Sequence, residues 1–239
     1  MNLTQLHNVY FIGIGGIGMS ALAKWFKHRG LSVAGYDRLS TPLTHSLEVL
    51  GIEVNYEDNI SQLSNKYVED PQTLVVYTPA IPSSSKLLKF FKAEKFQVKK
   101  RSEVLGMITR DHYSIAVAGT HGKTTISSMV AHAMHSSTKV CSAFVGGIMT
   151  NYDSNILIGD QENVVVVEAD EFDRSFLQLR PDFTVVTSLD PDHLDIYGNY
   201  ENMKESYLTF IDKTHQGGDI LLHKDVSSKL GMDLSRKYR

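Results

Sequence analysis

The stretch NVYFIGIGGIGMSALA, residues 8–23, decides the fold of the first part of the chain. Its mostly apolar start predicts a buried strand, and the glycines that follow have the spacing GxGxxG at Gly13, Gly15 and Gly18. Apolar residues then recur at helical spacing, and Asp37 follows a second short strand, 19 residues after Gly18. A turn of this kind lets backbone and a helix N-terminus approach a pyrophosphate. We therefore expect a diphosphate ligand at this turn.

The glycine pattern does not identify the diphosphate. A nicotinamide cofactor and a UDP-sugar both present a pyrophosphate and a ribose, and a turn that only allows close packing of helix on strand is a further alternative. We expect the pyrophosphate to lie over Gly15 to Gly18. The residues expected to contact the ligand are Gly13, Gly15, Gly16, Ile17, Gly18 and Asp37.

Strand and helix signals alternate along the whole chain. Strands are expected at residues 8–12, 33–36, 74–77, 97–99, 114–118, 164–167, 184–187 and 220–222. Helices are expected after the glycine-rich turns and near residues 41–51, 85–95 and 203–211; Thr41 before Pro42 is typical of an N-cap. In the helix after residue 122, the apolar face is expected to carry Ile126, Met129, Val130, Ala133 and Met134. The alternation predicts two α/β units with mainly parallel sheets, residues 1–108 and 109–239.

Composition excludes several classes of protein. The 239 residues carry a net charge of −3, and the Lys99-Lys100-Arg101 cluster is too short for a nucleic-acid surface. No apolar run approaches the roughly 20 residues of a membrane helix. The single cysteine, Cys141, excludes an internal disulfide, and the start of the sequence lacks the features of a secretory signal. We expect a cytoplasmic protein without nucleic-acid partners.

A second glycine-rich turn, GTHGKTT at residues 119–125, follows the strand expected at 114–118. Successive backbone N–H groups at a helix N-terminus form an anion cradle, in which Lys123 can reach the outer phosphates and Thr124 can offer a hydroxyl to Mg²⁺. The strict phosphate-loop pattern would need a glycine where Val117 stands, so this is a shorter form. A purely structural turn would not require a lysine followed by two threonines.

Acidic residues end the next buried strand. Four valines lead to Glu168, which places a carboxylate at the carboxyl edge of a sheet, where ligands bind in open α/β folds. An oxygen ligand there suits Mg²⁺. The acids that follow, Asp170, Glu171 and Asp173, are interpreted as helix-start charges favoured by the helix dipole, and for Asp173 a functional role stays open as the alternative.

His193 lies among carboxylates in the segment Asp190 to Asp195, after another buried strand. By itself such a histidine is more often part of a surface network, but its place in a unit with a phosphate loop favours function. His132 and His135 lie on a helix without acidic partners, and we interpret them as structural.

Together, residues 13–23, 119–125, 168–177 and 192–198 resemble the motifs of the Mur ligase family, over essentially the whole chain. The resemblance implies a Rossmann-like domain for a UDP-sugar, followed by a P-loop-type central ATPase domain and a third, C-terminal domain. This chain stops at Arg239, within or just after the central domain, so the third domain is expected to be missing.

The resemblance also implies ATP-dependent amide-bond formation through an acyl phosphate, with Mg²⁺. The implied substrates are UDP-N-acetylmuramate and L-alanine. Lys123 would stabilise charge on the transferring group. Thr124 and Glu168 would hold one Mg²⁺, and His193 would help to hold a second. The residues expected at the nucleotide are Gly119, Thr120, His121, Gly122, Lys123, Thr124, Thr125 and Asn155.

Two positions depart from the family pattern: His121 and Ser188 stand where asparagine is expected. The role of His121 stays open, and Ser188 leaves the polar contacts of its segment unassigned. The alternative functions are a ligase that recycles murein tripeptide, a non-catalytic module that binds UDP-sugar and ATP, and, more remotely, an NAD-dependent oxidoreductase. We expect the 239-residue chain to bind both nucleotides weakly and to ligate little alanine.

Overall fold

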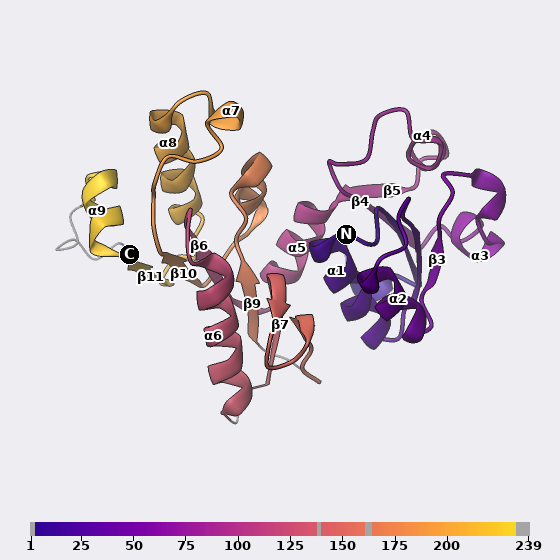
Figure 1. The fold of residues 1–239 in the computed structure, drawn as a ribbon, viewed down its shortest axis with the longest axis horizontal. Helices are drawn as coiled ribbons and strands as arrows, with labels where there is room; N and C mark the ends of the chain where they lie inside the picture. Colours follow the sequence, from indigo (N-terminus) through magenta and orange to yellow (C-terminus); the bar gives the residue numbers. More distant parts are fainter. Residues whose placement is uncertain (1–2, 138–139, 161–163, 233–239) are drawn as a thin grey trace. The chain divides into compact units, whose positions relative to one another are not determined.

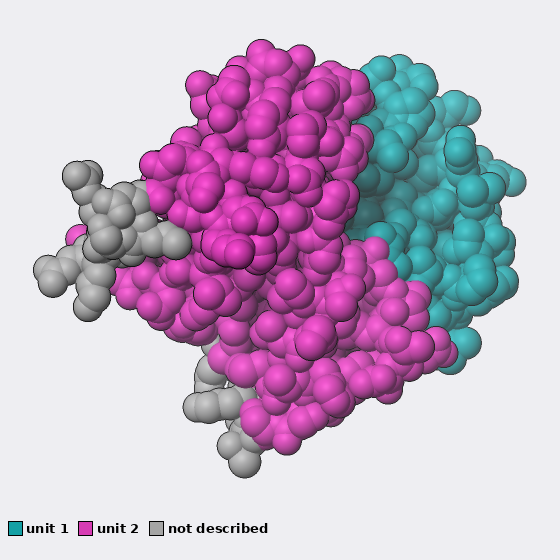
Figure 2. Space-filling view, turned by 60° about the vertical axis from the view of Figure 1, so that its left-hand side comes forward, with its two compact units in different colours: residues 1–104 teal, residues 105–239 magenta. Residues whose placement is uncertain are grey.

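The computed structural model describes residues 3–137, 140–160 and 164–232 and divides into two compact units, Met1–Val104 and Leu105–Arg239 (Figure 2). Helix α5 (Arg101–Arg110) contains the boundary. Both units are α/β with mainly parallel sheets, which confirms the predicted fold class. No helix in the described ranges is both long and apolar enough to cross a membrane.

The first unit is built on a five-stranded parallel sheet in the order β3-β2-β1-β4-β5 (Figure 1). Its central strand, β1 (Asn8–Ile12), is buried along its whole length, as expected of a strand covered on both faces. The other elements are β2 (Ser32–Tyr36), β3 (Glu53–Asn55), β4 (Thr73–Tyr77), β5 (Gln97–Lys100), α1 (Ile17–His28), α2 (Pro42–Val49), α3 (Asn65–Val68), α4 (Lys86–Ala93) and two short 3-10 helices, Leu3–Gln5 and Ile60–Gln62.

Neighbouring aromatic residues of β1 serve opposite faces of this sheet. The Tyr10 ring packs against Phe91 of α4, with 5.3 Å between centroids, and the Phe11 ring packs against Phe26 of α1 at 6.3 Å. The alternation follows from the two-residue period of a strand. The core of the first unit therefore lies on both faces of its sheet, and the loops lie at the ends of its strands.

The start of α2 confirms the predicted N-cap. The Thr41 hydroxyl accepts from the Thr44 backbone N–H at 3.3 Å, and the Thr44 hydroxyl accepts from the Thr41 N–H at 2.8 Å. Pro42 occupies the first turn, where its missing N–H costs nothing. This reciprocal pair fixes the helix that begins just after Asp37.

The second unit has a six-stranded sheet in the order β11-β10-β6-β9-β7-β8. Among its described residues, β7 and β8 pair antiparallel and the other neighbouring strands pair parallel. Residues 165–167 of β9 (Val164–Glu168) are completely buried. The other elements are β6 (Tyr113–Ala118), β7 (Cys141–Met149), β8 (Ser154–Leu157), β10 (Phe183–Val186), β11 (Asp219–Leu222), α6 (Lys123–Ser136), α7 (Leu194–Tyr197), α8 (Tyr200–Ile211), α9 (Lys224–Leu230) and the 3-10 segment Phe172–Gln178.

The predicted apolar face of α6 is wrong in part. Met129 is 65% exposed and Ala133 is exposed, whereas the fully buried positions are Ser127 and Ala131. Small residues at i and i+4 let the helix lie close to the sheet. The Ser127 hydroxyl can be buried because it donates to the Lys123 carbonyl at 2.6 Å. Val130 and Met134 are half-buried and pack against this core as predicted, so the count of apolar residues missed the small residues at the centre of the buried face.

Strand register brings the candidate loops to one edge of each sheet. In the first unit, Ile12 is level with Tyr36 and with Tyr77. In the second, Ala118 is level with Val186, and the preceding residue of β6 is level with Glu168. All these strands are parallel, so the loops that leave their carboxyl ends lie next to one another. In open α/β sheets this edge is where ligands bind.

Candidate functional site

The glycine-rich turn of the first unit is tied to β2. The Gly13 and Ile14 N–H groups both donate to the Tyr36 carbonyl, at 2.7 and 3.0 Å. The Gly15 N–H donates to the Asp37 carboxylate at 2.8 Å. The structure therefore brings the predicted acid to the predicted turn, and Asp37 helps to fix the shape of that turn.

The glycines of this turn differ in what the fold requires of them. A Cβ at Gly15 would lie 2.8 Å from a methyl of Thr44, and one at Gly18 would lie 2.6 Å from the Arg101 guanidinium. At Gly16 the nearest atom would be 3.6 Å away, which is an ordinary contact. Packing within the unit therefore explains the glycines at 15 and 18 but not the one at Gly16. Gly16 is the N-cap of α1, and Ile17 is its first residue.

The second turn connects β6 to α6, and two of its glycines have backbone angles that other residues rarely adopt. Gly119 has a φ of +135°, and a Cβ there would collide with the Thr187 hydroxyl. Gly122, the N-cap of α6, has a φ of +80°. These angles turn the chain sharply from the end of a buried strand into the start of a helix. The resulting turn has the local shape expected of an anion cradle.

Ser188, just after the neighbouring strand β10, forms hydrogen bonds to this turn. Its hydroxyl accepts from the His121 N–H at 2.7 Å and lies 3.0 Å from the Thr120 hydroxyl. Thr187 contributes a hydrogen bond from its hydroxyl to the His121 carbonyl at 2.5 Å. The position that the sequence left unassigned thus buttresses the turn. A serine is short enough to reach the backbone of the adjacent loop directly.

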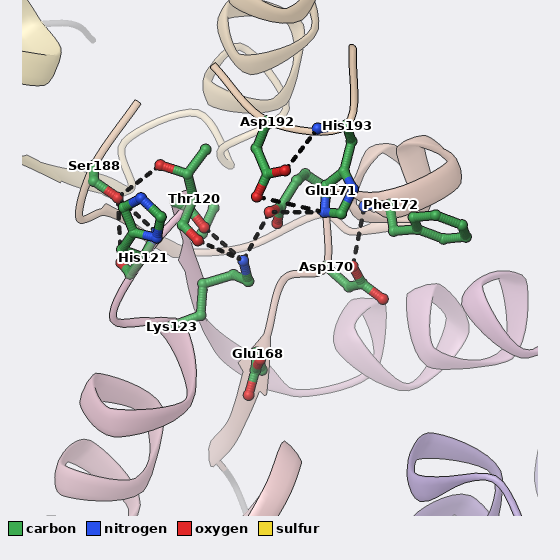
Figure 3. Close-up of polar contacts among 12 residues, drawn as sticks. Thr120, His121, Lys123, Glu168, Asp170, Glu171, Phe172, Ser188, Asp192 and His193 are labelled. Carbon is green, nitrogen blue, oxygen red and sulfur yellow. Dashed lines mark hydrogen bonds and ion pairs between the residues drawn. The ribbon is translucent and has the colours of Figure 1, made fainter. Parts of the chain in front are cut away.

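Lys123 forms a buried ion pair with Glu171, drawn in Figure 3. The ammonium lies 2.7 Å from Glu171 Oε1 and donates to the Gly119 carbonyl at 2.7 Å. Only 15% of the Lys123 side chain and 1% of the Glu171 side chain are exposed. Burial raises the pKa of the Glu171 carboxyl, and the hydrogen bond from Lys123 opposes that rise.

Thr124 and Glu168 meet, as expected of two residues that would share a cation. The Thr124 hydroxyl donates to Glu168 Oε1 at 2.9 Å, and the Gly146 N–H of β7 donates to Oε2 at 2.7 Å. Thr125 next to them is exposed. A hydroxyl and a carboxylate at a strand edge form an oxygen donor set that suits a hard cation.

His193 belongs to a different group of side chains. Its Nε2 lies 3.8 Å from Asp192 Oδ2 and 4.0 Å from Glu171 Oε1, and its backbone has a left-handed φ of +50° at the start of α7. One ligand atom from each of these three residues lies within 4.8 Å of the others (Figure 3). The predicted set of Thr124, Glu168 and His193 therefore falls into two groups: Thr124 contacts Glu168, and His193 lies with Asp192 and Glu171.

Glu171 is the residue that sequence reasoning missed. It was interpreted as a helix-start charge, but it is nearly fully buried and contacts both Lys123 and His193. Within the described residues its Oε2 atom makes no hydrogen bond. The signal in the sequence was its place three residues beyond the strand-end acid Glu168.

His121 and Asn155 lie in unlike surroundings. His121 is 70% exposed, with Nε2 3.7 Å from Asp190 Oδ2. Asp190 in turn accepts from the Lys229 ammonium of α9 at 2.6 Å, and this hydrogen bond lowers the pKa of the Asp190 carboxyl. Asn155 is fully buried in β8. His132 Nδ1 lies 2.8 Å from the Tyr152 hydroxyl, and both side chains line a cavity beside the second turn.

A cavity of about 340 Å³ opens beside the second turn. Its walls come from the first turns of α6 and from the end of β7 and the chain that follows it, and they include Thr124, Met129 and Ile148. The walls mix hydroxyl and apolar side chains. A cavity of this size can hold a nucleoside.

Comparisons with known proteins assign both halves of the chain. Residues 8–113 match the Mur ligase family, catalytic domain, and residues 117–237 match the Mur ligase middle domain. The UDP-N-acetylmuramate–L-alanine ligase of Flavobacterium johnsoniae is 53% identical over 227 residues, which cover 95% of this chain and 50% of that protein. The protein of the same name from Cytophaga hutchinsonii is 49% identical over 233 residues, covering 96% and 50%. The chain thus spans about half the length of the curated relatives it matches.

Solved structures agree with these matches. The UDP-N-acetylmuramate–alanine ligase of Thermotoga maritima superposes with a TM-score of 0.80 at 28% identity, covering 93% of this chain and 51% of that one. A UDP-N-acetylmuramate:L-alanyl-γ-D-glutamyl-meso-diaminopimelate ligase from Neisseria gives a TM-score of 0.82 at 24% identity, covering 94% and 75%. The second likeness is evidence of a shared fold.

Proposed function

Because the chain belongs to the Mur ligase family, we propose that it carries the UDP-sugar and ATP sites of a ligase that joins L-alanine to the carboxylate of UDP-N-acetylmuramate. The reaction would serve cytoplasmic synthesis of peptidoglycan precursors. The observation that carries the proposal is the contact of Thr124 with Glu168 directly beside Lys123, whose ammonium lies against the glycine-rich turn, in a chain whose curated relatives bear that ligase name.

In this reaction the muramate carboxylate attacks the γ-phosphorus of ATP, which gives an acyl phosphate and ADP. The amine of L-alanine then attacks the acyl carbon, and the amide bond forms as inorganic phosphate leaves with the carbon–oxygen bond broken. Phosphoryl transfer of this kind depends on positioning and on stabilisation of charge. Lys123 is placed to stabilise that charge because it begins α6 directly after the anion cradle.

The residues present fit Mg²⁺. Thr124 and Glu168 offer hard oxygen ligands, and Glu171 has a buried carboxylate oxygen without a hydrogen bond in the described part of the chain. Thr124 and Glu168 would hold one ion, and His193, with Asp192 and Glu171, would hold a second. A bound Mg²⁺ neutralises charge on the phosphates.

The UDP-sugar is assigned to the first unit. Its pyrophosphate would lie over Gly15 to Gly18. At Gly16 the absence of a side chain would let the pyrophosphate approach the backbone. Asp37 already accepts from the Gly15 N–H, so it would orient the turn as well as face the ribose. The 340 Å³ cavity beside Thr124 would take the nucleoside of ATP.

A chimera tests the activity, because the chain spans half the length of its relatives. This chain is joined to the second half of the Flavobacterium johnsoniae relative, and phosphate release from ATP is measured with UDP-N-acetylmuramate and L-alanine. We expect release that needs both substrates and is lost in Lys123→Ala. Release with the murein tripeptide but not with L-alanine would indicate the recycling ligase instead. Binding of both nucleotides without release would indicate a binding module, and binding of NAD without UDP-sugar an oxidoreductase.

A further inference from the structure

The Lys123–Glu171 pair lies at the glycine-rich turn, where the Lys123 ammonium would contact the phosphates of a nucleotide. The ammonium has three N–H donors, and two of them are directed to Glu171 Oε1 and to the Gly119 carbonyl, each at 2.7 Å. The Thr120 carbonyl, at 3.5 Å, is the only other acceptor recorded for it among the described residues. The charge of Lys123 is therefore balanced by a carboxylate of the same unit.

The carboxylate is held firmly in this place. Glu171 is 1% exposed, and its backbone carbonyl accepts from the Tyr197 hydroxyl at 2.7 Å, which anchors the loop after β9 to α7. Its Oε1 also lies 4.0 Å from His193 Nε2. A buried ion pair stays favourable only while each charge keeps a partner of the opposite sign.

A polyphosphate in the cradle carries the same sign of charge as Glu171 and needs the same ammonium. Lys123 Nζ lies 2.7 Å from Glu171 Oε1, so phosphate oxygens bound to the same ammonium would lie close to this carboxylate, in partly buried surroundings where like charges repel each other strongly. We propose that Glu171 is a positioning residue that holds the Lys123 ammonium and competes for it with the phosphates of the nucleotide. The inference rests on the proposed function only in that the turn binds polyphosphate.

Competition between Glu171 and polyphosphate for Lys123 determines whether polyphosphate affinity rises or falls when Glu171 is changed. In Glu171→Gln the side chain keeps its shape and can still accept from Lys123, but it loses its charge. Polyphosphate then binds without displacing a carboxylate and finds an ammonium that lacks a counter-charge. A merely structural role for Glu171 would give the opposite sign, because a damaged site binds more weakly.

The experiment titrates inorganic tripolyphosphate into the 239-residue protein by calorimetry, in buffer free of divalent cations. We expect Glu171→Gln to bind at least fivefold more tightly than the unmodified protein. The double variant with Lys123→Ala should lose that gain. Glu201→Gln is the matched control, because it removes the same charge from an exposed position of α8, where 72% of the side chain is accessible. We expect its affinity to be unchanged.

An unchanged or weaker affinity in Glu171→Gln, including no binding in either protein, overturns the inference. If that variant does not fold, a crystal structure of the unmodified protein with tripolyphosphate decides. Separation of Lys123 Nζ from Glu171 Oε1 beyond hydrogen-bonding distance supports competition, and retention of the 2.7 Å contact contradicts it. Because the probe is a simple phosphate, a chimera without ligase activity would overturn the proposed function while leaving this result to stand or fall separately.

Discussion

The Thr124 hydroxyl donates to the Glu168 carboxylate across 2.9 Å, and this contact joins the first turn of α6 to the end of β9. The second carboxylate oxygen accepts from Gly146, so three segments that are distant in the sequence meet at one side chain. Both oxygens of Glu168 are thus oriented before any cation arrives. Orientation of this kind is what a site needs to bind a hard cation with little rearrangement.

Metal dependence separates the roles of Lys123, Glu168 and His193. We expect Lys123→Ala to weaken ATP binding at every Mg²⁺ concentration, because a charge-assisted hydrogen bond worth roughly 1.5–3 kcal/mol is lost, or about tenfold or more. Glu168→Ala and His193→Ala should instead raise the Mg²⁺ concentration needed for half-maximal ATP binding. Calorimetric titration over a Mg²⁺ series measures this. If excess Mg²⁺ affects all three variants equally, the metal roles of Glu168 and His193 are wrong.

The two central glycines of the first turn should differ when substituted. Gly15→Ala places a methyl 2.8 Å from Thr44 and should lower the free energy of unfolding by about 1–3 kcal/mol through overpacking. A Cβ at Gly16 meets no such close neighbour, so Gly16→Val should lower the free energy of unfolding by less than about 1 kcal/mol, the scale of a changed N-cap. The same substitution should abolish UDP-N-acetylmuramate binding. Thermal unfolding and calorimetry test the pair. Unchanged sugar-nucleotide affinity in Gly16→Val would show that the pyrophosphate does not bind at this turn.

Ser188 should matter for the shape of the phosphate loop. Ser188→Ala leaves the His121 N–H without its 2.7 Å acceptor, so we expect a loss of about 1–3 kcal/mol in unfolding free energy together with weaker ATP binding. Ser206→Ala is the control, because that hydroxyl donates to the Asn202 carbonyl within α8, away from the loop. Chemical unfolding curves compare the two. Equal effects would show that Ser188 does not support the loop.

Acid should weaken the link between α9 and the phosphate loop. Lys229 lowers the pKa of the Asp190 carboxyl below its ordinary 3.8, so the pair stabilises the fold above that value, and this contribution is lost as pH falls through the lowered pKa. The stability difference between the unmodified protein and Lys229→Met should therefore be constant from about pH 5 to 8 and shrink towards pH 2. Unfolding measured across pH tests it. A difference that grows in acid would contradict this origin.

Sequence reasoning predicted the fold, and most of the residues that meet at the candidate site, because its signals were local. The strand at residues 8–12, the capping pair at Thr41 and the turn at residues 119–122 are each specified by a few adjacent residues, and all are present. The carboxyl-edge rule then predicted that acids after strands would gather at the glycine-rich turns, as Asp37 and Glu168 do.

What the sequence did not reveal depends on contacts between distant segments. β7 and β8 were not predicted, since Gly146 and Gly147 interrupt the apolar pattern and the pairing of the two strands is irregular. The buried face of α6 follows small residues whose hydroxyl is satisfied locally, which hydrophobicity does not report. Glu171 was missed because burial of a charge depends on Lys123, 48 residues away. Only the folded chain brings the two together.

Simultaneous binding of the two nucleotides tests the central claim most directly. The 239-residue protein is saturated with UDP-N-acetylmuramate and then titrated with ATP and Mg²⁺ by calorimetry. The two-site account predicts that ATP still binds, at one molecule per chain. It also predicts that Lys123→Ala weakens only this binding and that Gly16→Val removes only the binding of the sugar nucleotide. If one nucleotide displaces the other, or if either variant abolishes both, the assignment of separate UDP-sugar and ATP sites to the two units is contradicted.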